Sequence, residues 1–391
     1  MKTRILVLSA SVGGGHLRAA EAMEKGLQAA APDAHIENHD VLDFTNRLFK
    51  KVYAESYLDL VTRAPHLLGY LYDQMDQPSR SGKYRADRLR GAVERMNLLP
   101  FQKMLLSQPW DLIVNTHFLP AELVGRLRLK GKLDVPQVTV CTDLDTHRLW
   151  VNQPCERYFC ATDQGARYLH HWGVPTDATE VTGIPIDPVF GEPVDRAACR
   201  ARLGIEGKRP VVLQLCGGFG VGPVEAGYRA LLDVEQPTEL VVVCGRNESL
   251  LAQLQSVPRP ERHKVHLVGF TREMHDYMSC ADLVVTKPGG LTTSEILARG
   301  LPMVIANPIP GQESHNSDFL LEHGAAIKVH HPSLLALKVS QLLADTDRMA
   351  RMRQASRALG RPHAAREIAK KSLTLVRPKP RASARLELAA T

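Results

Sequence analysis

A glycine-rich segment in the second half of the chain combines groups that suit a nucleotide-sugar. Gly289 and Gly290 follow an apolar run and precede a helical pattern that begins at Leu291 and Thr292. Glycines let a backbone approach a diphosphate, and a helix start presents unpaired N–H groups and the positive end of its dipole. Glu295 lies one helical turn further in, where its carboxylate can accept hydrogen bonds from a ribose diol. We therefore predict a nucleotide-sugar site here.

A second glycine loop, near the N-terminus, ends in a histidine. Gly15 and His16 follow the first apolar run and open a helical pattern. A helix start disfavours the imidazolium cation, so His16 should hold its proton weakly, which suits a general base. A capping or hydrogen-bonded structural histidine is the alternative. Arg18 stands where a dinucleotide-binding loop would carry glycine or alanine, which argues against a dinucleotide site.

Polar and aromatic side chains follow two other apolar runs of the first half. His117 ends one run, and Asp143, Asp145, His147 and Trp150 follow the next. The two aspartates form a D-x-D pattern, but metal sites with that pattern belong to an architecture without repeated α/β halves, so we expect no metal. We expect one of the two carboxylates to face the molecule that accepts the sugar and to assist removal of a proton from it. The histidines and the tryptophan are expected on the same, acceptor side.

Four glycines fall within six positions after the first apolar run of the second half. They include Gly217, Gly218 and Gly220. This density is costly in chain entropy unless the turn requires it, and an anion-binding loop explains the requirement better than a merely tight turn.

Two further run ends of the second half supply candidates for a nucleotide. Arg246, beside Asn247, offers a fixed cation for a phosphate, with a surface arginine near a helix start as the alternative. Phe270 ends the next run, where exposed backbone groups could read the edge of a uracil.

The positions of these clusters follow from a regular alternation of short apolar runs with helical patterns, which is typical of a parallel sheet flanked by helices. Ligands bind at the carboxyl ends of strands in such sheets. The predicted strands are Arg4–Ser9, Ala34–Asn38, Asp111–Asn115, Pro136–Cys141, Arg157–Cys160, Glu180–Thr182, Val211–Leu215, Leu240–Cys244, Lys264–Val268, Leu283–Thr286, Met303–Ala306 and Ala326–Val329.

A proline-rich connector between the sixth and seventh predicted strands indicates two doubly wound α/β domains that face each other. We place an N-terminal acceptor-side domain at residues 1–188 and a C-terminal nucleotide-sugar domain at residues 189–365. Residues 366–391 are predicted to be a basic tail, in part disordered.

The composition is that of a soluble globular protein, with 44% hydrophobic and 23% charged residues. No apolar run approaches the ~20 residues of a membrane span, and the short N-terminal run suits a first strand better than a signal peptide. The seven cysteines form no C-x-x-C pair, so we expect buried thiols in a reducing compartment. The sequence therefore predicts a cytoplasmic protein.

The formal net charge of +7 is concentrated in two regions. Residues 46–106 carry eleven Lys and Arg against six Asp and Glu, and residues 361–391 carry eight against two. Between Phe44 and Tyr72 the basic residues alternate with apolar and aromatic ones. This pattern suits peripheral binding to an anionic membrane surface, and no nucleic acid is expected; a helical face packed on its own domain is the alternative.

Together these residues resemble the monogalactosyldiacylglycerol synthase and processive diacylglycerol glucosyltransferase family, relatives of the N-acetylglucosaminyltransferase that completes lipid II. The resemblance covers nearly the whole chain. The motifs that carry it are Gly13-Gly14-Gly15-His16, Thr142-Asp143 with His147 and Trp150, Gly183-Ile184-Pro185, Cys216 to Gly222, Cys244-Gly245-Arg246-Asn247, Thr286 to Thr292 with Glu295, and Gly311-Gln312-Glu313.

The resemblance implies a GT-B fold of two Rossmann-like domains and inverting, metal-independent hexosyl transfer from a UDP-sugar, without a cofactor. The acceptor it implies is a lipid, foremost diacylglycerol. Carried over to this sequence, the glycine loop at Gly217 and Arg246 would contact the diphosphate, while Gln312 and Glu313 would bind the sugar hydroxyls. His16 and Asp143 would lie across the cleft, with the acceptor.

Several alternatives remain open at the level of sequence. Cys216 stands where plant relatives carry glycine, which favours a bacterial branch and leaves glucose, galactose or N-acetylglucosamine as the sugar. The competing functions are an N-acetylglucosamine transferase with another acceptor, a UDP-N-acetylglucosamine 2-epimerase of the same fold, and a non-catalytic UDP-sugar binder. Processivity and oligomeric state have no signature in the sequence.

Overall fold

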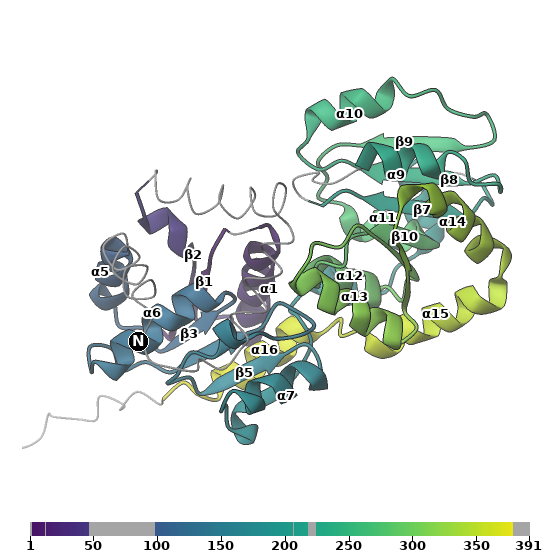
Figure 1. Ribbon diagram of the computed structural model, residues 1–391. Helices are drawn as coiled ribbons and strands as arrows, with labels where there is room; N and C mark the ends of the chain where they lie inside the picture. The colour runs from purple at the N-terminus through teal and green to yellow at the C-terminus, as the bar shows by residue number, and fades with distance from the viewer. Residues whose placement is uncertain (1, 12, 47–97, 206, 218–223, 378–391) are drawn as a thin grey trace, which may run out of the picture.

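A computed structural model describes residues 2–11, 13–46, 98–205, 207–217 and 224–377. Two α/β domains, one from each half of the chain, lie side by side (Figure 1). Each contains a six-stranded parallel sheet with helices packed against it. The predicted doubly wound two-domain fold is confirmed.

The N-terminal sheet has the strand order β2-β1-β3-β4-β5-β6. Its strands are β1 Arg4–Ser9, β2 His35–Asp40, β3 Leu112–Asn115, β4 Gln137–Val140, β5 Arg157–Cys160 and β6 Thr179–Val181. The chain leaves β1 toward one edge to form β2 and then returns to pair β3 on the other side of β1. This reversal puts a topological switch point between β1 and β3, and ligands of open α/β sheets bind at such points.

The C-terminal sheet has the order β12-β11-β10-β7-β8-β9, so its switch point lies between β7 and β10. Its strands are β7 Val211–Leu215, β8 Glu239–Val243, β9 Lys264–Val268, β10 Leu283–Thr286, β11 Met303–Ala306 and β12 Ala326–Val329. All twelve strand predictions are confirmed to within two residues. Most of the strands are buried apolar runs, which are a strong signal of a parallel sheet, whereas β2 and β6 are largely polar and only partly buried.

Helices connect the strands as right-handed crossovers require. The α-helices are α1 Gly15–Ala30, α5 Leu99–Ser107, α6 Phe118–Leu129, α7 Asp163–His171, α8 Arg196–Arg202, α9 Val224–Leu231, α10 Glu248–Gln255, α11 Met274–Cys280, α12 Gly290–Ala298, α13 Gln312–Glu322, α14 Leu335–Ala344, α15 Thr346–Leu359 and α16 Ala364–Leu373. Short 3-10 turns lie at Val41–Phe44, Arg148–Trp150, Thr176–Ala178, Pro188–Gly191 and Pro332–Leu334.

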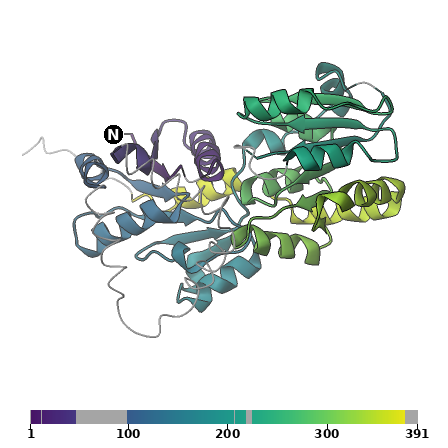
Figure 2. The ribbon, with the colours of Figure 1, turned by 45° about the horizontal axis from the view of Figure 1, so that its top comes forward.

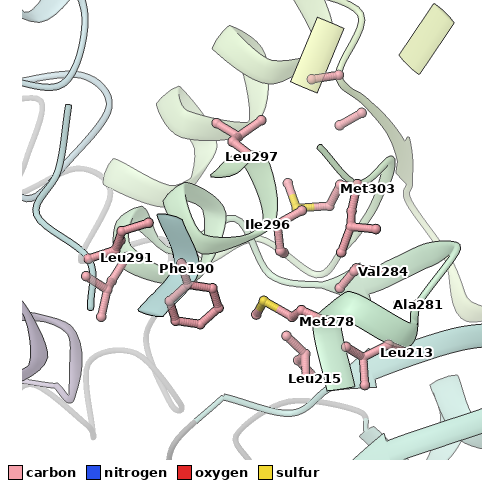
Figure 3. Packing of buried hydrophobic residues seen from close by; sticks show 14 of the residues in the cluster. Phe190, Leu213, Leu215, Met278, Ala281, Val284, Leu291, Ile296, Leu297 and Met303 are labelled. Carbon is pink, nitrogen blue, oxygen red and sulfur yellow. The ribbon is translucent and has the colours of Figure 1, made fainter. Parts of the chain in front are cut away.

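The core beneath the C-terminal site packs α12 against the sheet. Ile296 and Leu297 of α12 lie over Val284 of β10 and Met303 of β11 (Figure 3). Each of these four side chains is at most 4% exposed. This packing fixes the direction in which α12 leaves β10, and therefore the position of its first turn.

The C-terminal end of the described chain returns to the N-terminal domain. Ile368 and Ala369 of α16 are fully buried against Ile5 and Val7 of β1, and α16 lies beside α1 (Figure 2). The two helices come close because α1 carries a glycine: a Cβ on Gly26 would stand 2.6 Å from the carbonyl oxygen of Ala365. The predicted basic tail from residue 366 is therefore wrong for residues 366–377, where apolar side chains at helical spacing form a buried face.

The basic and aromatic stretch predicted to meet a membrane lies mostly outside the described residues, at 47–97. Among the described helices, none combines the length and apolar character needed to cross a bilayer. All seven cysteines are free, and six of them are buried, as the sequence predicted.

Candidate active site

The carboxyl edges of the two sheets face each other, so the loops that follow their strands meet at the seam between the domains. Gly290, the first residue of α12, lies against the carbonyl of Thr142, which follows β4. A Cβ on Gly290 would stand 2.1 Å from that oxygen, so only glycine fits. The sequence analysis explained this glycine by the close approach of a diphosphate. In the structure, the lack of a side chain at Gly290 allows the backbone of the other domain to come close.

His16 lies in the first turn of α1, directly after the switch-point loop. Its Nδ1 is 3.1 Å from the carbonyl oxygen of Thr116 and 2.9 Å from Oγ1 of Thr142. A carbonyl can only accept, so Nδ1 carries the proton and donates, which leaves Nε2 as the basic nitrogen. Burial lowers the pKa of His16 to about 4, against a smaller opposing effect of the Thr116 bond. The predicted weak proton affinity is present, but its main cause is burial rather than the helix dipole.

The acceptor-side candidates form one aromatic cluster around His16. The ring centroid of His117 lies 4.5 Å from that of His16, and the ring centroid of Trp150 lies 6.4 Å away. His147 packs on Trp150 at 5.7 Å between centroids. Burial lowers the pKa of His117 well below its usual value and that of His147 to about 3, with the neighbouring histidines adding to the effect. The structure thus brings all three predicted acceptor-side residues together. The imidazoles of His117 and His147 are neutral at pH 7.

Asp143 joins this cluster through Trp150. The indole Nε1 donates to Oδ2 of Asp143 at 3.3 Å, and Nε2 of His147 lies 3.8 Å from the same oxygen. Burial, with smaller contributions from the charges of Asp145 and Glu313, raises the pKa of Asp143 to about 7. A carboxyl group that titrates near neutrality can both take and release a proton there, which suits general acid–base chemistry. Of the two aspartates that the sequence left open, Asp143 has this property.

Helix α13 joins the C-terminal domain to the loop that contains these aspartates. Gln312, in its first turn, donates from Nε2 to the backbone carbonyl of Asp145. Asn316, one turn later and 1% exposed, accepts from the backbone N–H of Leu144 at 3.1 Å and donates to the carbonyl of Pro288 at 3.0 Å. The sequence analysis missed Asn316, although its position four residues after Gln312 places both amides on one helix face.

Glu295 of α12 is 1% exposed and forms an ion pair with Arg18 of α1. Its other carboxylate oxygen, Oε2, is buried and has no hydrogen-bond partner among the described residues. Burial raises the pKa of Glu295 to about 7, although the charge of Arg18 opposes the rise. Glu295 therefore has a carboxylate oxygen, Oε2, that could accept a hydrogen bond from a ribose, as the sequence predicted. Its other oxygen pairs with Arg18, which the sequence analysis did not place in the site.

Glu313 lies beside Gly289 at the start of α12. Its Oε2 accepts from the backbone N–H of Ile309 at 2.8 Å, and its Oε1 is 4.0 Å from Nζ of Lys287. Burial raises the pKa of Glu313. Because Oε1 has only this long ion pair among the described residues, it can accept from a sugar hydroxyl, as the resemblance implies.

The remaining donor candidates occupy the carboxyl ends of β7, β8 and β9. Gly217, with φ of +71°, follows β7 at the switch point; Gly218 and Gly220 lie outside the described residues. The guanidinium of Arg246 stacks 5.0 Å from the ring centroid of Phe270, and both side chains are exposed.

Asn247, beside them, accepts from the backbone N–H of Leu250 at 2.9 Å and so caps α10. Its side chain therefore has a structural use within the described chain. Leu291 and Thr292 occupy the first turn of α12, as predicted.

No three His, Cys, Asp or Glu side chains converge to hold a metal ion in the part of the chain that the structure describes. The expectation of a metal-independent, cofactor-free reaction stays a prediction.

Two family models match the chain, one for each domain. Residues 16–186 match the model of monogalactosyldiacylglycerol (MGDG) synthase, and residues 225–371 match that of the glycosyltransferase family 28 C-terminal domain. Each domain of the chain is therefore similar to a family of glycosyltransferases. These matches confirm the resemblance seen in the sequence, and the chain is a hexosyltransferase of the UDP-sugar-dependent class.

Curated relatives are similar to this glycosyltransferase over nearly its whole length. It is 28% identical over 367 residues to a processive diacylglycerol beta-glucosyltransferase of Bacillus pumilus, with 93% of each chain covered. It is 27% identical over 356 residues to a protein of the same name from Bacillus subtilis, with 90% of each covered.

Solved structures confirm the GT-B fold of the glycosyltransferase. The crystal structure of MurG from Acinetobacter baumannii matches it with a TM-score of 0.62 at 17% identity, covering 95% of this chain and 99% of that one. The co-structure of MnaA with UDP from S. aureus matches with a TM-score of 0.62 at 15% identity, covering 97% and 99%.

Proposed function

We propose that the protein transfers a hexose from a UDP-sugar to the hydroxyl group of diacylglycerol, with inversion at the anomeric carbon. The names of the curated relatives support this acceptor. The structural observation that carries the proposal is the placement of a neutral, oriented imidazole, His16, at the seam of the two domains, opposite the first turns of α12 and α13.

In the proposed reaction the acceptor hydroxyl attacks the anomeric carbon while its proton passes to a base. Nε2 of His16 suits this role, because Thr116 holds the proton on Nδ1. Asp143, with a pKa of about 7, is the second candidate for proton removal. The C–O bond to the diphosphate breaks, and UDP leaves as an anion that Arg246 and the first turn of α12 stabilise.

The proposed donor site lies on the C-terminal domain. Glu295 would accept from the ribose through Oε2, while Glu313 and Gln312 would hold the sugar hydroxyls. The loop at Gly217 would approach the diphosphate, with Phe270 beside the uracil. We further propose that the protein works at the cytoplasmic face of a membrane, where the basic residues of the sequence range 46–106 would attract anionic lipid.

Product analysis tests this function. The protein would be incubated with UDP-glucose, UDP-galactose or UDP-N-acetylglucosamine, with and without vesicles that contain diacylglycerol, and the products separated by mass and by epimer. We expect a glycosylated diacylglycerol from either UDP-glucose or UDP-galactose. Epimerised UDP-sugar alone would instead identify a 2-epimerase, and sugar transferred only to water would exclude the lipid acceptor.

A further inference from the structure

A second concave site lies in the C-terminal domain, at the opposite edge of the sheet from the candidate active site. It is a cavity of about 360 Å³ at the amino ends of β7 and β10, between α8 and the α14–α15 corner. Its volume falls in the range of small-molecule sites. The family resemblance and the predicted donor residues involve only the carboxyl edge of this sheet.

The cavity carries a strong excess of positive charge. Five cationic side chains line it against one carboxylate, Asp282, among the described residues; they are Arg196, Arg200, Lys208, Arg209 and Arg353. Like charges gathered in a concave, partly apolar space raise the local potential and attract anions.

Asp282 cannot neutralise this cluster. Its Oδ1 lies 2.9 Å from Nη2 of both Arg196 and Arg353, and its Oδ2 accepts from the backbone N–H of Val211 at 3.0 Å. Both carboxylate oxygens are therefore already engaged, and the carboxylate serves to hold two guanidinium groups at the cavity wall.

The other cations reach the cavity with donors to spare. Arg200 donates from Nη2 to the carbonyl of Gly207 at 2.8 Å and also lies 3.9 Å from Oε1 of the buried Glu239. Arg209 donates from Nη1 to the carbonyl of Arg262 at 3.1 Å. Each guanidinium has five N–H donors, so these contacts orient the groups and leave further donors for a ligand. The charge of Arg200 is partly offset by Glu239, whereas the carbonyl partner of Arg209 is neutral. Lys208 adds an exposed ammonium.

We propose that this cavity binds a phosphate group, carried by a soluble phosphorylated metabolite or by a phospholipid headgroup. Paired guanidinium forks match the geometry of phosphate oxygens. The lining also includes the apolar side chains of Leu343 and Met349, which would pack on the carbon skeleton next to the phosphate. A concave site of this size suits a compact headgroup better than an acidic polypeptide.

Calorimetric titration of the full chain with inorganic phosphate and with glycerol 3-phosphate, in the absence of UDP and at saturating UDP, tests the soluble source. Flotation with phosphatidylcholine vesicles, with or without phosphatidic acid, tests the lipid source. The test variant is Lys208→Gln with Arg209→Gln, which spares the pairs made by Asp282. Arg348→Gln with Arg351→Gln is the matched control, because it removes two exposed charges of α15 outside the cavity.

We expect the test variant to weaken phosphate binding, or phosphatidic acid-dependent flotation, about tenfold and the control to change it less than about twofold. Unchanged UDP binding by each variant would show that it is folded. Binding of the soluble phosphates would identify a soluble metabolite as the source of the phosphate, whereas flotation without such binding would identify a phospholipid headgroup. Three results would overturn the proposal. Equal losses of binding in both variants would show that the net charge of the protein, and not this cavity, attracts the anion. Loss of phosphate binding in the presence of UDP would place the anion in the donor site, and the absence of binding to both the soluble phosphates and the phosphatidic acid vesicles would exclude the site.

Discussion

Arg18 of α1 and Glu295 of α12 form an ion pair that joins the two domains at their facing edges. Glu295 is 1% exposed, whereas the Arg18 side chain is 44% exposed, so the arginine reaches from the surface of one domain into the buried first turns of the other. A single side chain thus connects the helix that carries His16 with the carboxylate predicted to bind the donor ribose.

Replacement of Arg18 by alanine should weaken donor binding. The charge of Arg18 opposes the rise in the pKa of Glu295, so its loss raises that pKa above about 7 and leaves the carboxyl protonated at neutral pH. We expect KM for the UDP-sugar to rise about tenfold, equivalent to roughly 1.4 kcal/mol, with partial recovery in Arg18→Lys.

Lys25→Ala is the matched control, because Lys25 lies on the same helix and pairs with Asp187, but both partners are more than a third exposed. We expect less than about a twofold change. Equal effects of both variants would mean that Arg18 acts only by holding the domains together.

Replacement of His16 by alanine should lower kcat by about 10² to 10⁴, because the proposed base is lost. UDP affinity, measured by calorimetry, should change less than about twofold. His171→Ala, which removes an exposed histidine of α7, is the control. A surviving kcat in the His16 variant would assign proton removal to Asp143.

The buried carboxyl of Asp143 should make stability fall as the pH rises. Its pKa is about 7 in the folded protein and near 3.8 when unfolded, so the unfolded chain binds fewer protons in between. The stabilising contribution is full below pH 3.8 and is lost as the pH passes through about 7. Asp143→Asn removes this loss, and we expect its stability relative to the wild type to increase by on the order of 2 kcal/mol between pH 5 and pH 8, measured by urea unfolding.

Asp134→Asn supplies a control of opposite sign. The guanidinium of Arg377 lowers the pKa of Asp134, so that carboxylate stabilises the protein above its unfolded pKa. This variant should gain no stability at pH 8. A pH-independent difference between Asp143→Asn and the wild type would contradict a raised pKa at Asp143.

Replacement of Gly290 by alanine should open the seam between the domains, because its Cβ would stand 2.1 Å from the Thr142 carbonyl oxygen. We expect a larger radius of gyration in X-ray scattering and a loss of kcat/KM of about tenfold or more. Gly289→Ala, whose Cβ would have ordinary contact with Glu313 at 3.7 Å, should leave the radius unchanged. Equal radii for all three proteins would show that the contact yields by local adjustment.

Replacement of Ile368 by alanine should destabilise the N-terminal domain by about 3 kcal/mol, because the side chain is fully buried against β1. Lys370→Ala, on the exposed face of the same helix, should cost less than about 0.5 kcal/mol. Thermal unfolding followed by circular dichroism measures both. Equal stability of the two variants would mean that the last helix is a dispensable tail.

The sequence by itself determined the elements and most of the candidate residues. Most of the parallel strands are buried on both faces and read as short apolar runs, so they were predictable from local sequence. The polar residues that follow these runs had to lie at the carboxyl edges. Glycine and carboxylate positions around Gly289 and Glu295 indicated the donor class because few other ligands need that combination.

Only the tertiary structure decided how the two edges meet. Strand order is not encoded in local periodicity, so the switch points that bring His16 beside His117 and Trp150 could not be derived from single runs. The partners of Glu295 and Gly290 belong to the other domain, more than 140 residues away, and the burial that sets the pKa values of His16 and Asp143 arises only when the cluster closes. Long-range packing, which local sequence patterns do not specify, therefore turned a set of separate motifs into one site.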